Sequence, residues 1–273
     1  MRMINLMENT EGDHGCLYEH GLSFYIETLN HKLLIDTGAS KSFIENARIR
    51  GVDLKDVDLL ILSHGHYDHA GGILDFTKIN PTAPIYMQRF AGNAYYHKSK
   101  TVERYIGIDP DILSLPQLIL LDGDHTIDEE LSIFTGVKGR RLWPEGNRIL
   151  KEKKGDSFVQ DEFLHEQYLV ITSGNQKILI SGCAHNGILN ILDKFMELYG
   201  KEPDVVISGF HMMKRDGYTK KDEDLVYAIA QELKKYHTKF YTGHCTGELP
   251  FQILQSVMRD QVQYVHSGDE VNL

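Results

Sequence analysis

The feature that most constrains this sequence is a run of histidines directly after a short apolar segment. Residues 57–63 read VDLLILS, and the next six residues read HGHYDH, which brings together His64, His66, Asp68 and His69. The length and flanks of the apolar segment favour a buried strand over a helix. In an extended loop, side chains at alternate positions lie on one side, so three ligand-type groups face the same way. We therefore expect this loop to bind metal.

His69 does not follow that alternation, and its placement depends on a turn. Gly71 and Gly72, followed by two apolar residues, suit a tight entry into a helix that swings the His69 ring back toward the same region. Two metal ions could then share the segment. Imidazole and carboxylate groups together suit zinc, iron or manganese, and zinc is the ion we expect first.

Three later strand patterns also end in histidine. The segments SGCAH, SGFH and TGHCTG place His185, His211 and His244 just beyond short apolar runs. Loops at the carboxyl ends of strands are where α/β folds gather ligands and catalytic groups. We expect these histidines to converge with the first cluster on one site.

The rest of the pattern predicts an α/β sandwich in a single domain over residues 1–273, with helices on the outer faces of packed sheets. The expected strands are residues 22–28, 32–35, 57–63, 81–86, 167–172, 177–181, 204–208, 239–242 and, as the last strand, 261–266. The expected helices are residues 40–50, 87–98, 187–199, 222–237 and 249–259.

Composition excludes several classes of protein. The 273 residues include 29 Lys and Arg against 39 Asp and Glu, and the net charge of −10 makes nucleic-acid binding unlikely. No apolar run approaches the roughly 20 residues that cross a bilayer, and residues 1–15 lack the apolar core of a secretion signal. Three cysteines are too few for a disulfide scaffold. We therefore expect a cytoplasmic protein without a membrane partner; the pattern leaves its oligomeric state open.

Residues 136–155 contrast with the acidic remainder, because they hold seven Lys or Arg residues and two Glu residues. One interpretation is a solvated surface loop, which is the usual meaning of a run of charges. The other is a basic insertion that acts as a lid and attracts a small anionic substrate. Arg140 and Arg141 are then the candidate substrate contacts.

These motifs resemble those of the metallo-β-lactamase superfamily. SHGHYDHAGG is similar to its HxHxDH signature, and IDTG at residues 35–38 is similar to its first motif. EHGLS at 19–23, SGCAHNGILNIL at 181–192, SGFHM at 208–212 and TGHCTG at 242–247 resemble one branch. That branch comprises the dihydropterin–ribofuranosylaminobenzene-phosphate synthases and their bacterial relatives. The resemblance implies an αββα sandwich.

The resemblance also implies roles for individual residues. It assigns two divalent metal ions, the first to His64, His66 and His185 and the second to Asp68, His69 and His244. Asp36 would orient a ligand imidazole by accepting its hydrogen bond, and a turn-forming role is the alternative. Cys183 stands where many members carry an Asp that bridges the metals. We expect a buried structural cysteine there, with a ligand role as the alternative.

Two further histidines are expected beside the metals, because the six ligands already suffice. His211 would contact the substrate or transfer a proton, and together with Asp68 it is the catalytic candidate. His20 would contact the substrate, and a hydrogen-bonded core imidazole is the alternative for it.

Three functions are compatible with the pattern. The first is a hydrolase in which a metal-bound water loses a proton near neutral pH and attacks a small anionic, phosphorylated substrate. The second, implied by the branch resemblance, is a transferase that joins a dihydropterin methyl diphosphate to ribofuranosylaminobenzene 5'-phosphate. The third is a metal-dependent sensor or ligand-binding protein.

Overall fold

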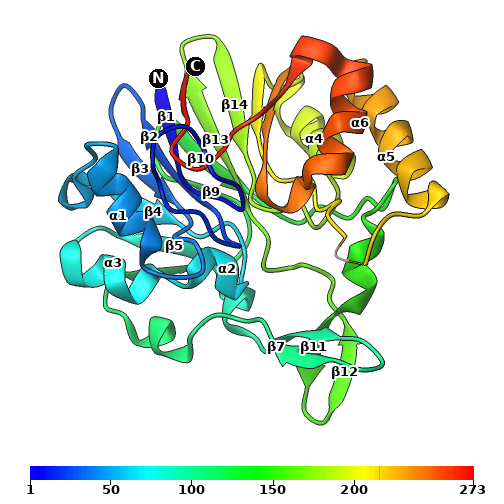
Figure 1. Cartoon of the computed structure of the whole chain (residues 1–273). Helices are drawn as coiled ribbons and strands as arrows, with labels where there is room; N and C mark the ends of the chain where they lie inside the picture. Colours follow the sequence, from blue (N-terminus) through cyan, green and yellow to red (C-terminus); the bar gives the residue numbers. More distant parts are fainter. Residues whose placement is uncertain (215) are drawn as a thin grey trace.

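The computed structural model describes residues 1–214 and 216–273, and two large sheets pack face to face at its centre (Figure 1). Over these residues the strands form three sheets, two of seven strands and one of four. Helices cover the outer faces of both large sheets, so the layers run helix, sheet, sheet, helix. This is the αββα sandwich that the sequence predicts.

The first sheet combines the N-terminal part of the chain with its last strand. Its strands, in spatial order, are β18 (Glu270–Asn272), β1 (Arg2–Met7), β2 (Ser23–Glu27), β3 (Lys32–Ile35), β4 (Leu59–Ile61), β5 (Ile85–Gln88) and β8 (Leu118–Leu121). The neighbouring helices are α1 (Ser42–Ile49), α2 (Tyr67–Ala70) and α3 (Ile73–Ile79).

The second sheet contains later parts of the chain. Its strands, in spatial order, are β17 (Val262–Tyr264), β16 (Lys239–Thr242), β15 (Val205–Ile207), β14 (Gln176–Ile180), β13 (Tyr168–Ser173), β10 (Leu131–Phe134) and β9 (His125–Thr126). Its outer face is covered by α4 (Ile188–Tyr199), α5 (Lys220–Leu233) and α6 (Glu248–Met258). Across the described ranges, no helix combines the length and apolar character that crossing a membrane requires.

Side chains along the strands alternate between two apolar layers. In β3, Leu33 and Ile35 lie in the layer between the two sheets, whereas Leu34 packs in the layer that contains the helices of the first sheet. In β13, Leu169 lies between the sheets and Val170 lies under the helices of the second sheet. Full burial of one such aliphatic side chain stabilises the fold by about 2 kcal/mol. Because alternate side chains enter two different apolar layers, these strands are apolar on both faces.

Parallel pairing brings the histidine-bearing loops to one end of the sandwich. β3, β4 and β5 are parallel neighbours in the first sheet, and β14, β15, β16 and β17 are parallel neighbours in the second. Carboxyl ends of parallel neighbours lie at the same edge of a sheet. The loops after β4, β14, β15 and β16 therefore lie close together.

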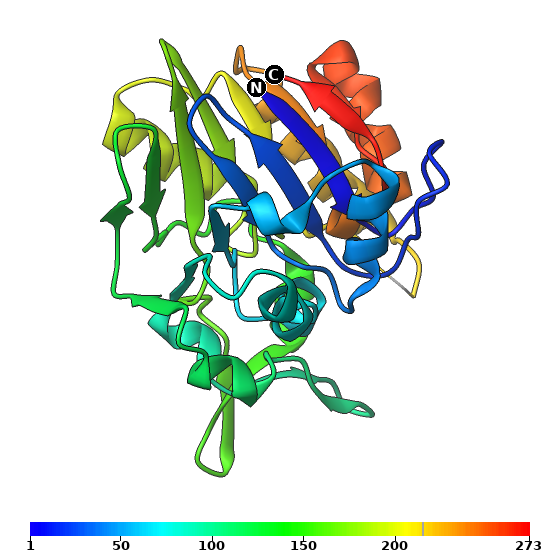
Figure 2. The ribbon, with the colours of Figure 1, turned by 90° about the vertical axis from the view of Figure 1, so that its left-hand side faces the viewer.

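The four-stranded sheet departs most from the sequence prediction. Its strands are β12 (Ser157–Gln160), β11 (Leu150–Lys154), β6 (Tyr95–Lys98) and β7 (Glu103–Tyr105), and it extends from the lower end of the sandwich (Figure 2). The expected helix over residues 87–98 is wrong, because a short 3-10 helix (Arg89–Gly92) gives way to β6, which pairs with β11. Aromatic side chains favour a strand, and local periodicity cannot reveal a partner far along the chain.

Two other expectations need correction. β17 is not the last strand, since β18 follows it and pairs antiparallel with β1; β18 reads EVN and has too few apolar residues to reveal itself. The strand expected at residues 81–86 begins later, at Ile85, because the preceding segment forms a bend.

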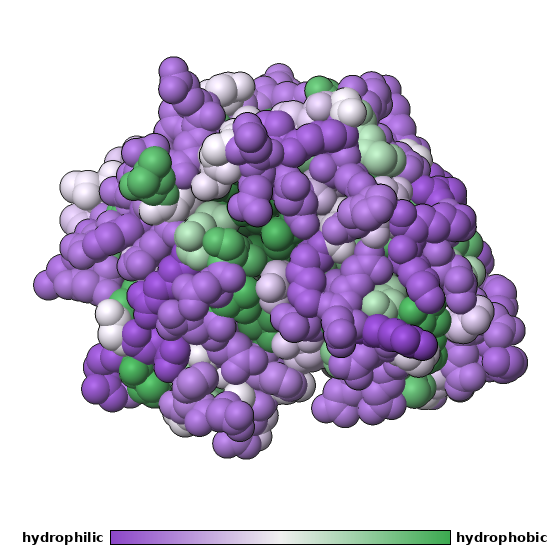
Figure 3. Space-filling view, turned by 90° about the horizontal axis from the view of Figure 1, so that it is seen from above, coloured by the Kyte–Doolittle hydropathy of each residue, from purple (hydrophilic) through white to green (hydrophobic). Residues whose placement is uncertain are grey.

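The basic segment, residues 136–155, is a loop in its first part, then a 3-10 helix (Glu145–Ile149), and then β11. At the opposite end of the sandwich, the face that carries both chain ends is mainly hydrophilic, with apolar side chains in a hollow near its middle (Figure 3).

Candidate metal centre

Six side chains from the two large sheets meet at one end of the sandwich. They are His64, His66, Asp68 and His69 after β4, His185 after β14, and His244 after β16. None of the six is more than 8% exposed. Buried polar groups are costly unless each finds a partner, so this cluster requires hydrogen bonds, ligands or both.

The loop after β4 is held by a close approach to another segment. A Cβ atom at Gly65 would lie 2.4 Å from the carbonyl oxygen of Ala91, so only glycine fits between His64 and His66. The amide of Gly65 also donates a hydrogen bond to Nδ1 of His165 at 2.9 Å. These contacts hold the backbone between the two imidazole-bearing residues in place.

His64, His66 and His185 form the first group of candidate ligands. The Nε2 atoms of His64 and His185 are 3.2 Å apart, and the His66 ring centroid lies within 4.9 Å of both other centroids. Burial, together with neighbouring imidazoles, lowers the pKa of His64 and of His185 well below the ordinary value. Burial lowers the pKa of His66 to about 3. All three rings are therefore neutral at pH 7 and offer lone pairs.

Asp68, His69 and His244 form the second group. Oδ2 of Asp68 lies 3.5 Å from Nε2 of His244 and 3.9 Å from Nε2 of His69. Burial opposes ionisation of Asp68, but the nearby imidazoles of His69 and His244 outweigh it and hold the pKa of the carboxyl well below its usual range. Burial likewise opposes protonation of His69, yet Asp36 and Asp68 raise its pKa to about 9. A metal ion that binds here displaces that proton.

Asp36 holds two of these imidazoles from outside the group. Its Oδ2 accepts hydrogen bonds from Nδ1 of His69 and from Oγ of Ser63, each at 2.6 Å. That hydroxyl in turn accepts from Nδ1 of His64 at 2.9 Å. Asp36 has a φ of 59°, which is uncommon for a residue other than glycine, and these bonds keep it there. The geometry leaves Nε2 of both rings as the ligand atom.

Two asparagines hold the imidazoles of His185 and His244, the candidate ligands that follow strands of the second sheet. Nδ1 of His185 donates to Oδ1 of Asn147 at 3.0 Å, and the Asn147 amide donates to the His185 carbonyl at 2.7 Å. Nδ1 of His244 donates to Oδ1 of Asn9 at 2.7 Å, and the Asn9 amide donates to the His244 carbonyl at 3.2 Å. Both ring orientation and tautomer are thereby fixed.

The donor atoms fit bound cations. Nε2 of His66 and Nε2 of His244 are buried and have no hydrogen-bond partner within the described part of the chain. Nε2 of His64 and Nε2 of His185 face each other as lone pairs, because each ring already donates through Nδ1. A divalent ion would satisfy these atoms. Imidazole and carboxylate oxygen suit zinc, iron or manganese.

Cys183 lies between the two groups. Its Sγ atom is within 4.8 Å of ligand atoms of His64 and His185, and also within 4.8 Å of ligand atoms of His69 and His244. The Sγ atom and Nε2 of His69 are 3.2 Å apart. Burial, reinforced by the neighbouring Cys245, raises the pKa of the Cys183 thiol well above its usual value. The thiol is therefore protonated while no metal is bound.

His20 and His211 both stand beside these groups. Nε2 of His20 is 3.3 Å from Oδ2 of Asp68, and its ring centroid is 5.2 Å from that of His244. The His211 ring centroid is 4.1 Å from that of His185. The structure thus brings both expected neighbours to the centre.

The two arginines expected to contact substrate, Arg140 and Arg141, have different partners. Arg140 donates to Oδ1 of Asn186, the residue next to His185, at 3.1 Å and pairs with Glu162 at 3.0 Å. Arg141 pairs instead with Asp193 and Glu232 on the outer helices, at 3.0 and 2.9 Å. Arg140 therefore contacts a neighbour of a candidate ligand, whereas the guanidinium of Arg141 contacts the outer helices.

Sequence reasoning missed several supporting residues. Asn9 and Asn147 carry no motif, and only the fold places them against ligand rings. His165, which belongs to none of the motifs, is fully buried, and its Nε2 donates to Oδ2 of Asp161 at 3.1 Å. Glu166 accepts the backbone amide of His185 at 2.6 Å. The density of acidic and histidine residues in the segment DEFLHE was the one available signal.

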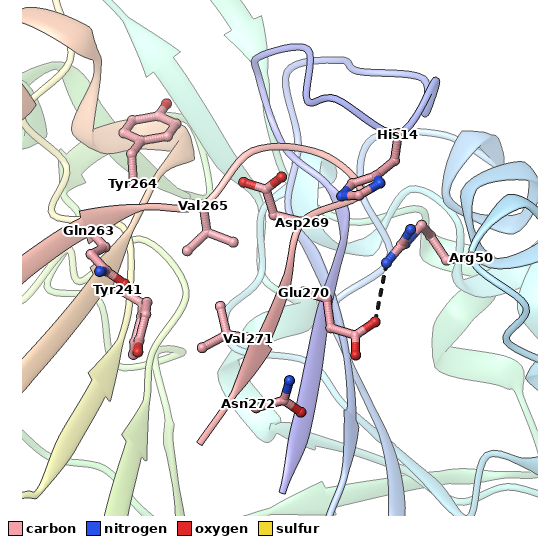
Figure 4. Close-up of a pocket in the computed structure, with 10 residues that line it drawn as sticks. All are labelled: His14, Arg50, Tyr241, Gln263, Tyr264, Val265, Asp269, Glu270, Val271 and Asn272. Carbon is pink, nitrogen blue, oxygen red and sulfur yellow. Dashed lines mark hydrogen bonds and ion pairs between the residues drawn. The ribbon is translucent and has the colours of Figure 1, made fainter.

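Two cavities differ in their relation to the centre. One is beside His211 and is lined mainly by apolar side chains, including Met212, Met213 and Leu225, with Lys214 and Tyr218. The other opens between β17 and β18 (Figure 4). Its ten lining residues include no candidate ligand, and Arg50 and Glu270 form an ion pair there at 3.2 Å. Of these two cavities, the one beside His211 adjoins the centre.

Comparison with known families gives a match over most of the chain. The sequence pattern described as the Metallo-beta-lactamase superfamily matches residues 19–238. A 7,8-dihydropterin-6-methyl-4-(beta-D-ribofuranosyl)-aminobenzene-5'-phosphate synthase of Methanocaldococcus jannaschii is 28% identical, over 92% of this chain and 88% of that protein. An uncharacterised protein of the same organism is 29% identical, over 90% of this chain and 91% of that protein.

Comparison with solved structures agrees with this family match. The crystal structure of a metal-dependent hydrolase of the beta-lactamase superfamily has a TM-score of 0.85 and 26% identity, covering 100% of this chain and 99% of that one. Zinc-bound PqqB from Methylobacterium extorquens has a TM-score of 0.57 at 12% identity and 100% coverage of both chains, which is a likeness of fold.

Proposed function

Because the chain belongs to the metallo-β-lactamase superfamily, we propose that it is a metal-dependent hydrolase that acts on a small phosphorylated substrate. It would bind two divalent ions, and zinc is the ion that we expect first. His64, His66 and His185 would hold one ion, and Asp68, His69 and His244 the other.

The observation that carries this proposal is the shared orientation of the imidazoles. His64, His69, His185 and His244 each donate through Nδ1 to a group outside the cluster. Their Nε2 atoms are left to face the centre. Those of His64, His185 and His244 are buried lone pairs that a cation would satisfy, and that of His69 carries a proton that a cation would displace. A cluster that only stabilised the fold would not require the same tautomer, with the proton on Nδ1, in all four rings.

The chain's own residues would then position substrate and control protons. Two divalent ions bound here would supply Lewis acidity and lower the pKa of water. Asp68, held ionised, would keep the second ion in place, and Asp36 would keep the rings of His64 and His69 aligned. His20, next to Asp68, would contact the substrate. Arg140 would attract its anionic group from the basic segment.

A second candidate is a transferase that joins a dihydropterin methyl diphosphate to ribofuranosylaminobenzene 5'-phosphate. The relative named as a synthase for that product, 28% identical over 92% of this chain, favours it. The cavity beside His211 would offer apolar contacts and Tyr218 to a flat ring. The ions would then stabilise the diphosphate as a leaving group.

Product analysis separates these proposals. Zinc-loaded protein is incubated with a panel of phosphomonoesters and phosphodiesters, and separately with the two transferase substrates together and singly; products are identified by mass spectrometry. Hydrolysis adds one water to a single substrate, whereas transfer gives a joined product only when both are present. The same protein with His66→Ala serves as the inactive control. Absence of product in every arm with fully loaded protein contradicts both proposals and leaves the binding-protein alternative.

A further inference from the structure

Three sulfur and imidazole groups meet at the carboxyl ends of three adjacent parallel strands. Cys183 follows β14, His211 follows β15, and Cys245 follows β16. Their ligand atoms, the two Sγ atoms and a ring nitrogen of His211, all lie within 4.8 Å of one another. His211 and Cys245 belong to neither group of the centre described above.

Two features of the backbone, at positions 209 and 211, accommodate this cluster. A Cβ atom at Gly209 would lie 2.5 Å from Sγ of Cys245, so any other residue there would push the sulfur away. The amide of His211 donates to the same Sγ at 3.3 Å, and His211 has a φ of 49°, an uncommon conformation for histidine. Strain of this kind persists where surrounding contacts impose it and is frequent at binding sites.

One atom of the cluster lacks a partner. Nδ1 of His211 is buried and makes no hydrogen bond with any residue in the described ranges. A buried ring nitrogen without a partner is costly, and a bound ion would satisfy it.

We propose that Cys183, His211 and Cys245 bind a further metal ion, of the thiolate-preferring class represented by zinc and copper(I). Two thiolates and one imidazole are a donor set that such ions select over magnesium, calcium or manganese. Two thiolates on one tetrahedral zinc ion lie about 3.8 Å apart, because each Zn–S bond is about 2.3 Å. The spacing of the cluster permits this with small side-chain movements.

This ion would have an open position toward the cavity beside His211, which that side chain lines. Three protein ligands with a vacant fourth are typical of ions that meet substrate. His211 would act as a ligand of this ion, in place of the substrate or proton-transfer role expected from the sequence.

Cobalt(II) titration tests the proposal, because a cobalt–thiolate bond gives a charge-transfer band in the near ultraviolet. Metal-free, reduced wild-type protein is titrated with cobalt(II), alongside Cys245→Ser, His211→Ala and the control Cys16→Ser. Cys16 is buried next to Gly268, away from the cluster. We expect Cys245→Ser to lose about half of the band and about one equivalent of bound cobalt, and His211→Ala to lose the same equivalent. Cys16→Ser should match wild type.

Every other result speaks against the site. Equal bands in Cys245→Ser and wild type would mean that Cys183 alone, or neither cysteine, binds metal. A single free thiol in the purified, unfolded protein would mean that Cys183 and Cys245 form a disulfide instead. His66→Ala separates this inference from the proposed function, since it should remove turnover and metal from the first group while the thiolate band remains. Circular dichroism checks that each variant is folded. If Cys245→Ser is unfolded, its loss of metal is not counted, and the result for folded His211→Ala decides.

Discussion

Nδ1 of His244 donates a hydrogen bond to Oδ1 of Asn9 at 2.7 Å, although the two residues are 235 positions apart in the chain. The Asn9 amide completes the pairing by donating to the His244 carbonyl. Asn147 pairs with His185 in the same two ways. Each asparagine therefore fixes one candidate ligand in both ring orientation and tautomer.

Asn9→Ala should weaken metal binding at the second group by about 10-fold to 100-fold, the usual cost of losing an outer partner of a ligand. The His244 ring would lose its fixed tautomer while keeping its Nε2. Competition with a chromogenic chelator measures the affinity. Asn175→Ala, in the exposed turn between β13 and β14, is the matched control and should bind like wild type. Unchanged affinity in Asn9→Ala would show that the pairing does not serve the ligand.

His66→Ala should remove the metal of the first group and abolish turnover, because two remaining imidazoles leave the ion without a third strong ligand. Inductively coupled plasma mass spectrometry of protein purified without added metal or chelator gives the stoichiometry. His97→Ala, on the four-stranded sheet, is the control. Turnover by metal-free His66→Ala protein would contradict the hydrolase proposal.

Asp68→Ala should lower the metal content from about two equivalents to about one, since Asp68 is the carboxylate of the second group alone. The same mass spectrometry measures it. About one equivalent in both wild type and variant would indicate a single ion at this centre, and a mechanism that uses two would then fail.

Arg140→Ala should raise KM several-fold with little change in kcat, because the positive charge of Arg140, which contacts the neighbour of His185, would favour binding of an anion before reaction. Arg141→Ala is the control, because both ion-pair partners of Arg141, Asp193 and Glu232, lie on the outer helices. Steady-state kinetics at two salt concentrations would test the charge effect, which should shrink at the higher one. Equal changes in both variants would argue against a substrate contact by Arg140.

Asp222→Ala should destabilise the protein by about 1 kcal/mol, because Asp222 and Thr219 form a reciprocal capping box at the start of α5. The side-chain hydrogen bond from Lys214, with those from Thr219, lowers the pKa of Asp222 to about 2. The carboxylate thus stabilises the fold above its unfolded pKa of about 4, and this contribution is lost as the pH falls toward about 2. Urea unfolding at pH 7 and at pH 3 should show the difference between wild type and variant shrinking at the lower pH. A constant difference would contradict the assignment.

Strand-end histidines made the centre visible in the sequence. His64, His66, His185 and His244 each follow a short apolar run, and parallel pairing of those runs brings the loops to one edge. The two halves of the sandwich were predictable for a similar reason, since their strands are apolar on both faces and their helices are amphipathic.

Long-range pairs were not predictable. Tyr95 lies in a strand because β6 pairs with β11, and nothing near it in the chain reveals that partner. Asn147 lies in the basic segment, whose composition indicates a solvated loop or a lid, yet it forms part of a 3-10 helix and is fully buried against His185. Such residues acquire their role from the fold, and one sequence carries no local signal for them.

The candidate ligands are divided between the two large sheets, with Asp68 on the loop side of β4 and His185 and His244 beyond β14 and β16. Ions at this centre would therefore act as cross-links between halves of the molecule that also meet through apolar side chains and through hydrogen bonds such as that between His244 and Asn9. By mass action, free metal at a hundredfold excess over its dissociation constant would add about 2.7 kcal/mol of folding stability per ion. The melting temperature of this protein should then report the availability of metal around it.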